Sequence, residues 1–274
     1  MIPITFRASL FQKGNLMATQ ADQSGDKRRK LVKRFGKKLF RGTLLEFLSK
    51  QSKIPDQPVL DNALFPWAEE LRVQWPEIRD ELEALLEHRA ALPSFQEISP
   101  DQARISSDAR WKTFMLYGFG TRMDFGCEMC PKTAAALEKL PNISNAFFSI
   151  LAPGKHIPRH RGVTKGLVRC HLGLRVPKGP ERCLIEIDDQ PMRWGEGEMF
   201  FFDDTYPHEV WNETSEERAV LLFDIERPMG PAGRAVSRAM ISVLRRTAYF
   251  KDAMRNQRAW EQRYRETVLA GQGH

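Results

Sequence analysis

The chain has 274 residues, of which 42% are hydrophobic and 28% charged, and its formal net charge is +7. This length suffices for a full hydrophobic core in one large or two small domains, and the composition is typical of globular proteins. These values exclude a disulfide-stapled miniprotein, a fibrous chain and a wholly disordered one.

The longest apolar runs have the length of a strand. A membrane-spanning helix needs roughly 18 or more consecutive apolar residues, so the sequence predicts no transmembrane helix. The N-terminal segment also lacks the apolar centre and small-residue cleavage site of a signal peptide. We therefore expect a cytoplasmic location.

Positive charge is concentrated at the two ends of the chain. Residues 1–55 carry 13 Lys and Arg against 3 Asp and Glu, residues 231–274 carry 9 against 3, and residues 56–230 carry 20 against 29. These shifts predict a basic N-terminal arm, an acidic central domain and a basic C-terminal region with these boundaries. We expect no nucleic-acid partner, because the centre is acidic and no nucleic-acid-binding motif accompanies the basic ends.

Residues 27–41 carry nine basic residues and no acidic one, and Leu31, Phe35 and Leu39 share one helical face. One interpretation is peripheral contact with the anionic inner face of a membrane, where each cation contributes about 1 kcal/mol. The other is a solvated, partly disordered tail. The sequence leaves both open.

Helical spacing of apolar residues predicts two helices within residues 61–88, with a break near Pro76. A strand is expected at 111–117 and a helix at 131–140, where a proline occupies the first turn. Residues 233–268 are predicted to be helical and basic.

From residue 145 the hydrophobic period changes to two. Short strands separated by Gly- and Pro-rich turns predict an antiparallel sandwich or barrel. In one of them, alternation puts Arg169 and His171 on one face and Cys170 and Leu172 on the other. The expected strands are 146–152, 167–176, 183–187, 198–202, 209–211 and 218–225.

Four of the six histidines fall in this all-β region: His156, His160, His171 and His208. Imidazoles of the same pleat parity on neighbouring strands point inward together, which is how small barrels build a metal site. Arg218 opens an almost wholly apolar strand, and a buried charge needs an anionic partner such as a dicarboxylate ligand.

A long, ordered set of motifs covers about residues 110–229. In these motifs the chain resembles the aspartyl/asparaginyl β-hydroxylase family of Fe(II)- and 2-oxoglutarate-dependent dioxygenases. The resemblance implies a mainly β fold with flanking helices and a double-stranded β-helix core, a cupin-like jelly roll. The motifs are His160-Arg161-Gly162, Arg169-Cys170-His171-Leu172-Gly173-Leu174, Trp194-Gly195-Glu196-Gly197-Glu198, Phe202-Asp203-Asp204, His208-Glu209-Val210-Trp211-Asn212 and Arg218.

The resemblance implies that His160 and His208 hold the iron. Many iron oxygenases add a carboxylate two residues after the first histidine. That position is Gly162 here, and the family resembles this chain in leaving the place to water or cosubstrate. Asp204, four residues before His208, has two open interpretations: it orients a metal-bound water or a ligand imidazole, or it caps a turn. His156 receives no role.

The same resemblance implies the cosubstrate site. Arg218, helped by Ser149, would bind the distal carboxylate of 2-oxoglutarate, and Arg169 with His171 would bind its keto-acid end. Guanidinium groups suit this task because they bind carboxylates through two parallel hydrogen bonds. Leu151 would line the same pocket.

The implied reaction uses O2 to hydroxylate an unactivated C–H bond while 2-oxoglutarate becomes succinate and CO2. Two substrate classes stay open, the acyl chains of lipid A and the side chains of peptidyl Asp or Asn. Resemblance at 111–117, 130–133 and 224–229 to a bacterial lipid A hydroxylase branch favours an anionic lipid, as do the basic flanks. The absence of apolar anchor segments opposes it.

A catalytically silent β-barrel binding protein is the alternative to an enzyme. The joint presence of the two histidines and two arginines argues against it. Cys127 and Cys130 have the CxxC spacing of zinc and redox sites, but too few further ligands accompany them, and we expect reduced thiols.

Overall fold

The computed structural model describes residues 42–179 and 181–270. Residues 42–51 are helical, whereas the basic segment 27–41 lies outside the described residues. From Leu48 onward the chain forms one compact unit. In the described part of the chain, no helix is long and apolar enough to cross a membrane.

Short helices precede the sheets. The two helices expected within residues 61–88 are present, and Pro76 lies in the first turn of the second one, where its missing N–H costs nothing. The elements of this region are β1 (Val59–Leu60), η1 (Asn62–Leu64), α2 (Ala68–Arg72), α3 (Trp75–Leu86), η2 (Arg89–Ala91), α4 (Phe95–Ile98) and η3 (Pro100–Arg104).

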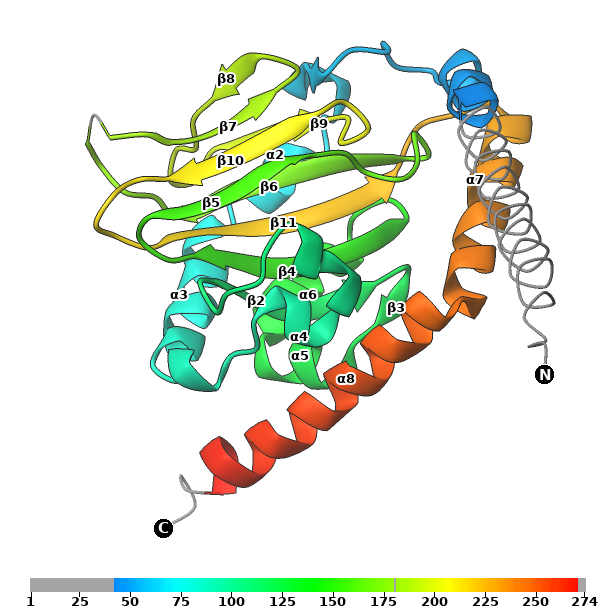
Figure 1. The fold of residues 1–274 in the computed structure, drawn as a ribbon. Coiled ribbons are helices and arrows are strands. Elements are labelled where there is room, and N and C mark those ends of the chain that lie inside the picture. The colour runs from blue at the N-terminus through cyan, green and yellow to red at the C-terminus, as the bar shows by residue number, and fades with distance from the viewer. Residues whose placement is uncertain (1–41, 180, 271–274) are drawn as a thin grey trace, which may run out of the picture. The chain divides into compact units, whose positions relative to one another are not determined.

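Two antiparallel sheets form the centre of the molecule (Figure 1). The larger has the strand order β1-β9-β6-β11-β4-β2-β3, and the smaller has the order β5-β10-β7-β8. Their strands are β2 (Trp111–Gly118), β3 (Thr121–Arg122), β4 (Ile143–Leu151), β5 (Lys155–His160), β6 (Leu167–Arg175), β7 (Cys183–Ile187), β8 (Gln190–Met192), β9 (Met199–Phe202), β10 (His208–Asn212) and β11 (Arg218–Glu226).

The connections confirm the predicted fold class. From β4 onward the chain passes back and forth between the sheets: β4, β6, β9 and β11 lie in the larger sheet, and β5, β7, β8 and β10 in the smaller. This alternation winds the chain into a double-stranded β-helix, the jelly-roll arrangement of two facing sheets.

Strand β5 was not predicted from the sequence. It contains Pro158, and its apolar and polar residues alternate only weakly along the sequence; both features argue against a central strand. In the structure β5 pairs only with β10 and forms the edge of the smaller sheet, where a proline is tolerated.

The remaining helices flank the larger sheet: α5 (Asp124–Met129), α6 (Pro131–Glu138), α7 (Pro231–Arg246), α8 (Ala248–Tyr264) and η4 (Arg265–Leu269). Figure 1 shows α8 crossing below the β2–β3 end of that sheet and α7 passing beside the ends of its strands. The expected helices at 131–140 and 233–268 are thereby confirmed, the second as a pair.

Strand parity divides the apolar residues into two cores. Cys170 and Leu172 of β6 pack on the helix side of the larger sheet, with Ile78 and Leu82 of α3. The other core lies between the sheets, where residues of both contribute: Phe147, Val220 and Leu222 from the larger, and Ile157, Ile185 and Val210 from the smaller. The polar face of β6 predicted from the sequence therefore turns toward the space between the sheets.

The four cysteines are buried free thiols. Burial raises the pKa of Cys127 to about 11. A thiol held in its protonated form is a poor nucleophile and a poor metal ligand.

Candidate active site

A cavity of about 240 Å³ opens between the two sheets. The predicted site residues in its walls come from five strands that lie far apart in the sequence, namely β4, β5, β6, β10 and β11. Six of the predicted site residues line it: Ser149, His160, Arg169, His171, His208 and Arg218.

The two predicted iron ligands face each other. His160 ends β5, His208 begins β10, and the antiparallel pairing of these strands puts the two residues directly opposite. Their ring centroids are 4.2 Å apart. The register of one strand pair thus places histidines that are distant in the sequence side by side.

Backbone hydrogen bonds fix the tautomers of both imidazoles. His160 Nδ1 lies 2.8 Å from the Pro158 carbonyl oxygen, and His208 Nδ1 lies 3.0 Å from that of Tyr206. A carbonyl can only accept, so each Nδ1 carries the proton and donates it. Each Nε2 therefore keeps a free lone pair, as a metal ligand requires.

Burial keeps both rings neutral. It lowers the pKa of His160 to about 4, and burial together with the neighbouring His160 lowers the pKa of His208 to about 3. Neutral imidazole is the form that binds metal ions.

Asp204 lines the same cavity as the histidine pair. A Cβ atom at Gly162 would come within 2.0 Å of the Asp204 Oδ1 atom, so this carboxylate fills the space that a side chain at 162 would take. Burial raises the pKa of Asp204 to about 6, with Arg169 opposing the shift. Within the described ranges, no group of three or more His, Cys, Asp and Glu side chains is arranged to hold a metal ion.

Arg169 is surrounded by carboxylates. Its Nε and Nη2 donate to the two oxygens of Asp224 at 2.8 and 3.0 Å, and Nη1 lies 3.1 Å from Asp204. Burial disfavours its charge, but Asp224 and Asp204 outweigh burial and raise the Arg169 pKa. The predicted contact of Arg169 with the keto acid stays a prediction, and these carboxylates compete for the same guanidinium.

Arg218 has the opposite surroundings. Only 2% of its surface is exposed, its Nη1 donates to the Ser149 carbonyl oxygen at 3.2 Å, and its guanidinium lies 4.3 Å from the centre of the Trp194 ring. Its Nε atom is buried without a hydrogen-bond partner, and no carboxylate of the described residues pairs with it. Burial lowers the Arg218 pKa to about 10.

Two further polar groups point to a ligand near Arg218. The Ser149 hydroxyl accepts a hydrogen bond from Trp111 Nε1 at 3.0 Å, which leaves its own proton free to donate. The Trp194 indole donates to His171 Nδ1 at 3.2 Å, so the proton of neutral His171 is on Nε2. That Nε2 is buried without a partner.

The other candidates lie elsewhere. Leu151 shares the inter-sheet face with Ser149 but is fully buried in the core, and it is not among the residues that line the cavity. The predicted role of Leu151 at the cosubstrate site stays a prediction. His156 is half exposed and lies 2.6 Å from a Glu209 oxygen, outside the cavity wall.

Sequence reasoning missed the positioning residues Asp224 and Trp194. Asp224 is the second charged residue of the apolar strand that begins at Arg218, and Trp194 belongs to a turn motif rich in glycine. Each differs in chemical character from its neighbours in the sequence. Only the β6–β11 register, which pairs Asp224 with Arg169, shows what Asp224 contacts.

Comparison with known proteins gives matches along most of the chain. The family described as "Aspartyl/Asparaginyl beta-hydroxylase" matches residues 72–228. An "Ornithine lipid ester-linked acyl 2-hydroxylase" of Rhizobium tropici is 43% identical over 215 residues, which cover 78% of this chain and 76% of that protein.

The human "Aspartyl/asparaginyl beta-hydroxylase" is 33% identical over 163 residues, which cover 58% of this chain and 21% of the human protein. This chain therefore matches about a fifth of that relative. A solved Pseudomonas putida prolyl-4-hydroxylase aligns with a TM-score of 0.35 at 19% identity, over 57% of this chain and 88% of the other.

Proposed function

This chain belongs to the aspartyl/asparaginyl β-hydroxylase family, and from that premise we propose that it is an Fe(II)- and 2-oxoglutarate-dependent hydroxylase that acts on the ester-linked acyl chain of an ornithine-type lipid. The cofactor assignment rests on two kinds of polar group that line the same cavity. Two neutral imidazoles with free Nε2 atoms lie in the same cavity as a buried arginine, Arg218, that has no carboxylate partner among the described residues.

The residues fit an iron ion held by His160 and His208. The two imidazoles would supply part of its coordination and would leave the rest to cosubstrate, O2 and water. When bound, Fe(II) supplies the redox chemistry that activates O2. Asp204 lies against Gly162 and can accept a hydrogen bond from water in this space.

The residues also fit a dicarboxylate. The Arg218 guanidinium with the Ser149 hydroxyl would bind one carboxylate, and the His171 Nε2–H would donate to the other end of the molecule. Binding would supply the missing partners of the Arg218 and His171 nitrogens. Buried polar groups without partners are costly, so a bound ligand stabilises this arrangement.

Similarity to the Rhizobium tropici protein supports a lipid substrate, because it extends over most of both chains. The cavity adds a physical argument, since Phe119, Leu244 and Phe250 give it apolar walls. Peptidyl Asp or Asn remains the second substrate class that the experiment tests. We further propose that residues 27–41 contact an anionic membrane surface, where such a lipid would be found.

The experiment measures succinate and hydroxylated product with purified protein, 2-oxoglutarate, O2 and anaerobically added Fe(II). Separate reactions contain ornithine lipid micelles, lipid A micelles or a set of Asp- and Asn-containing peptides. We expect ornithine lipid to stimulate succinate formation and to gain one oxygen atom on the ester-linked acyl chain, which mass spectrometry locates.

Two results would contradict the proposal. Stimulation by peptides alone would assign the protein to the other substrate class. Absence of succinate in every reaction, with no Fe(II) binding in a direct metal titration, would instead support a silent binding protein.

A further inference from the structure

The two C-terminal helices form part of the cavity wall. Although α7 and α8 follow the last strand of the double-stranded β-helix, they form part of the same compact unit. Five of their apolar side chains line the cavity that contains the histidine pair: Ile241, Leu244, Phe250, Ala253 and Met254.

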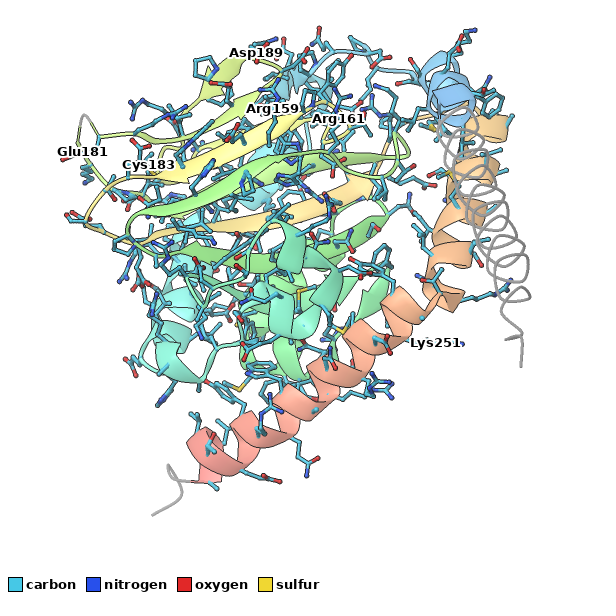
Figure 2. The ribbon with its side chains drawn as sticks, in the orientation of Figure 1. Arg159, Arg161, Glu181, Cys183, Asp189 and Lys251 are labelled. Atoms are coloured by element: carbon cyan, nitrogen blue, oxygen red, sulfur yellow. The ribbon has the colours of Figure 1, made fainter. Side chains whose placement is uncertain are left out.

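Polar contacts fasten this wall in place. The Tyr249 hydroxyl accepts a hydrogen bond from the Ser99 hydroxyl at 3.2 Å, and Asn256 Nδ2 donates to the Ile98 carbonyl oxygen at 3.3 Å. These contacts join α8 to the neighbouring α4–η3 segment, which also lines the cavity. Lys251 of α8 is exposed and points away from the sheets (Figure 2). The face of α8 that carries Lys251 is therefore turned to the solvent, and another face lines the cavity.

The cavity entrance combines apolar and positive groups. Arg104 and Arg161 are exposed and line the cavity, and neither forms an ion pair within the part of the chain that the structure describes. Val163, which also lines the cavity, is 57% exposed. Arg161 follows the end of β5 (Figure 2) and is therefore next to the ligand His160. This edge suits a molecule with an anionic end and an apolar chain.

In the proposed reaction, the α7–α8 wall and the cavity entrance would bind different parts of the lipid. Hydroxylation at C2 occurs on the carbon next to the ester carbonyl, so the polar end and the acyl tail leave the reacting carbon in opposite directions. Resting on the proposed function, we infer that the acyl tail lies along the α7–α8 wall and that these helices determine the preferred acyl-chain length. The two entrance arginines face the polar end of the lipid.

This wall lies outside the family match, which ends at residue 228, whereas α7 begins at Pro231. The catalytic groups and the proposed tail-binding residues are thus on separate parts of the chain. A change in the helices can alter the substrate preference without touching the histidines or Arg218.

The test uses the full chain with an equimolar mixture of ornithine lipids that carry one short or one long ester-linked acyl chain. Mass spectrometry gives the ratio of the two hydroxylated products, which is independent of the amount of active enzyme. Ala253→Trp narrows the part of the cavity lined by α8, and Met254→Ala widens it. Ala259→Trp is the matched control, because it places the same indole on an exposed position of α8.

We expect Ala253→Trp to shift the product ratio toward the short chain by at least about tenfold, since a few methylene groups excluded from an apolar pocket change kcat/KM by this amount. Met254→Ala should shift it toward the long chain, and Ala259→Trp should keep the wild-type ratio. Met254→Ala keeps the test decisive if Ala253→Trp fails to fold.

Wild-type ratios in both cavity variants, with active wild-type enzyme, would overturn the tail assignment and leave the proposed function standing. If the wild type hydroxylates neither lipid, the proposed function fails first, and the tail assignment fails with it.

Discussion

The two arginines that face the cavity from the larger sheet differ in what balances their charge. Arg169 contacts the carboxylates of Asp224 and Asp204, whereas Arg218 has a carbonyl oxygen and an indole ring beside it and no carboxylate among the described residues. A buried charge is stable only with a partner. Arg169 therefore has its ionic partners within the fold, and we propose that a bound ligand supplies the partner of Arg218.

The largest effect should come from the histidines that lie in the same cavity as these two regions. His160→Ala or His208→Ala removes one of the two proposed imidazole ligands of iron. Loss of a group that only orients a ligand already costs 10–100-fold in metal affinity, so we expect more than about 100-fold loss of Fe(II) affinity and turnover at background level.

Metal titration and succinate formation measure these losses, and circular dichroism checks the fold. Asn256→Ala, in the helical wall, is a control that should keep Fe(II) affinity. Wild-type Fe(II) affinity in the His160→Ala protein would refute the iron assignment.

Arg169→Met tests the arginine that is paired with carboxylates. The substitution leaves the buried Asp224 carboxylate without its cation, and breaking a buried pair costs about 3–5 kcal/mol. Denaturant unfolding should show this loss in the free energy of unfolding. If Arg169 instead served mainly to bind the keto acid, the variant would keep its stability and require more 2-oxoglutarate.

Arg218→Met tests the arginine that has no carboxylate partner among the described residues. No carboxylate of the described residues loses a partner, so the free energy of unfolding should stay level or rise. Affinity for 2-oxoglutarate should fall, since hydrogen bonds to a charged group contribute about 1.5–3 kcal/mol, a factor of roughly 10–150 in Kd.

Calorimetric titration of 2-oxoglutarate and denaturant unfolding measure these two quantities on the same protein. Arg218→Lys keeps the charge but loses the planar fork, and it should recover part of the affinity. A loss of stability equal to that of Arg169→Met, with unchanged affinity, would show that the two arginines do not differ.

The resemblance carried by the ordered motifs predicted the histidine pair and the jelly-roll core. Arg218 was identified as a charged residue in an almost wholly apolar strand, and the cavity-facing side of the strand with His171 required only the alternation of neighbours. The partners of Arg169 were not predictable in this way, since they follow from the β6–β11 register and from a loop that brings Asp204 against Gly162.

Two other features were hidden for similar reasons. Strand β5 carries Pro158, and its position at a sheet edge depends on the whole topology. The apolar face of α7 and α8 was visible in the sequence, but its place in the cavity wall depends on contacts such as Tyr249 with Ser99, far away along the chain.

The smallest predicted effect is a pH dependence of stability that comes from the histidines alone. Unfolded imidazoles titrate near pH 6.5, whereas burial lowers the pKa of His160 to about 4 and that of His208 to about 3. Between these values the unfolded chain binds more protons than the folded one, so these groups make the free energy of unfolding fall as the pH drops from about 6.5 toward 4. Thermal unfolding of metal-free protein across this range should show a shallower slope in the double variant His160→Gln/His208→Gln. An unchanged slope would mean that the imidazoles are protonated in the folded protein, in which case Fe(II) binding would have to displace protons from both ligands at this pH.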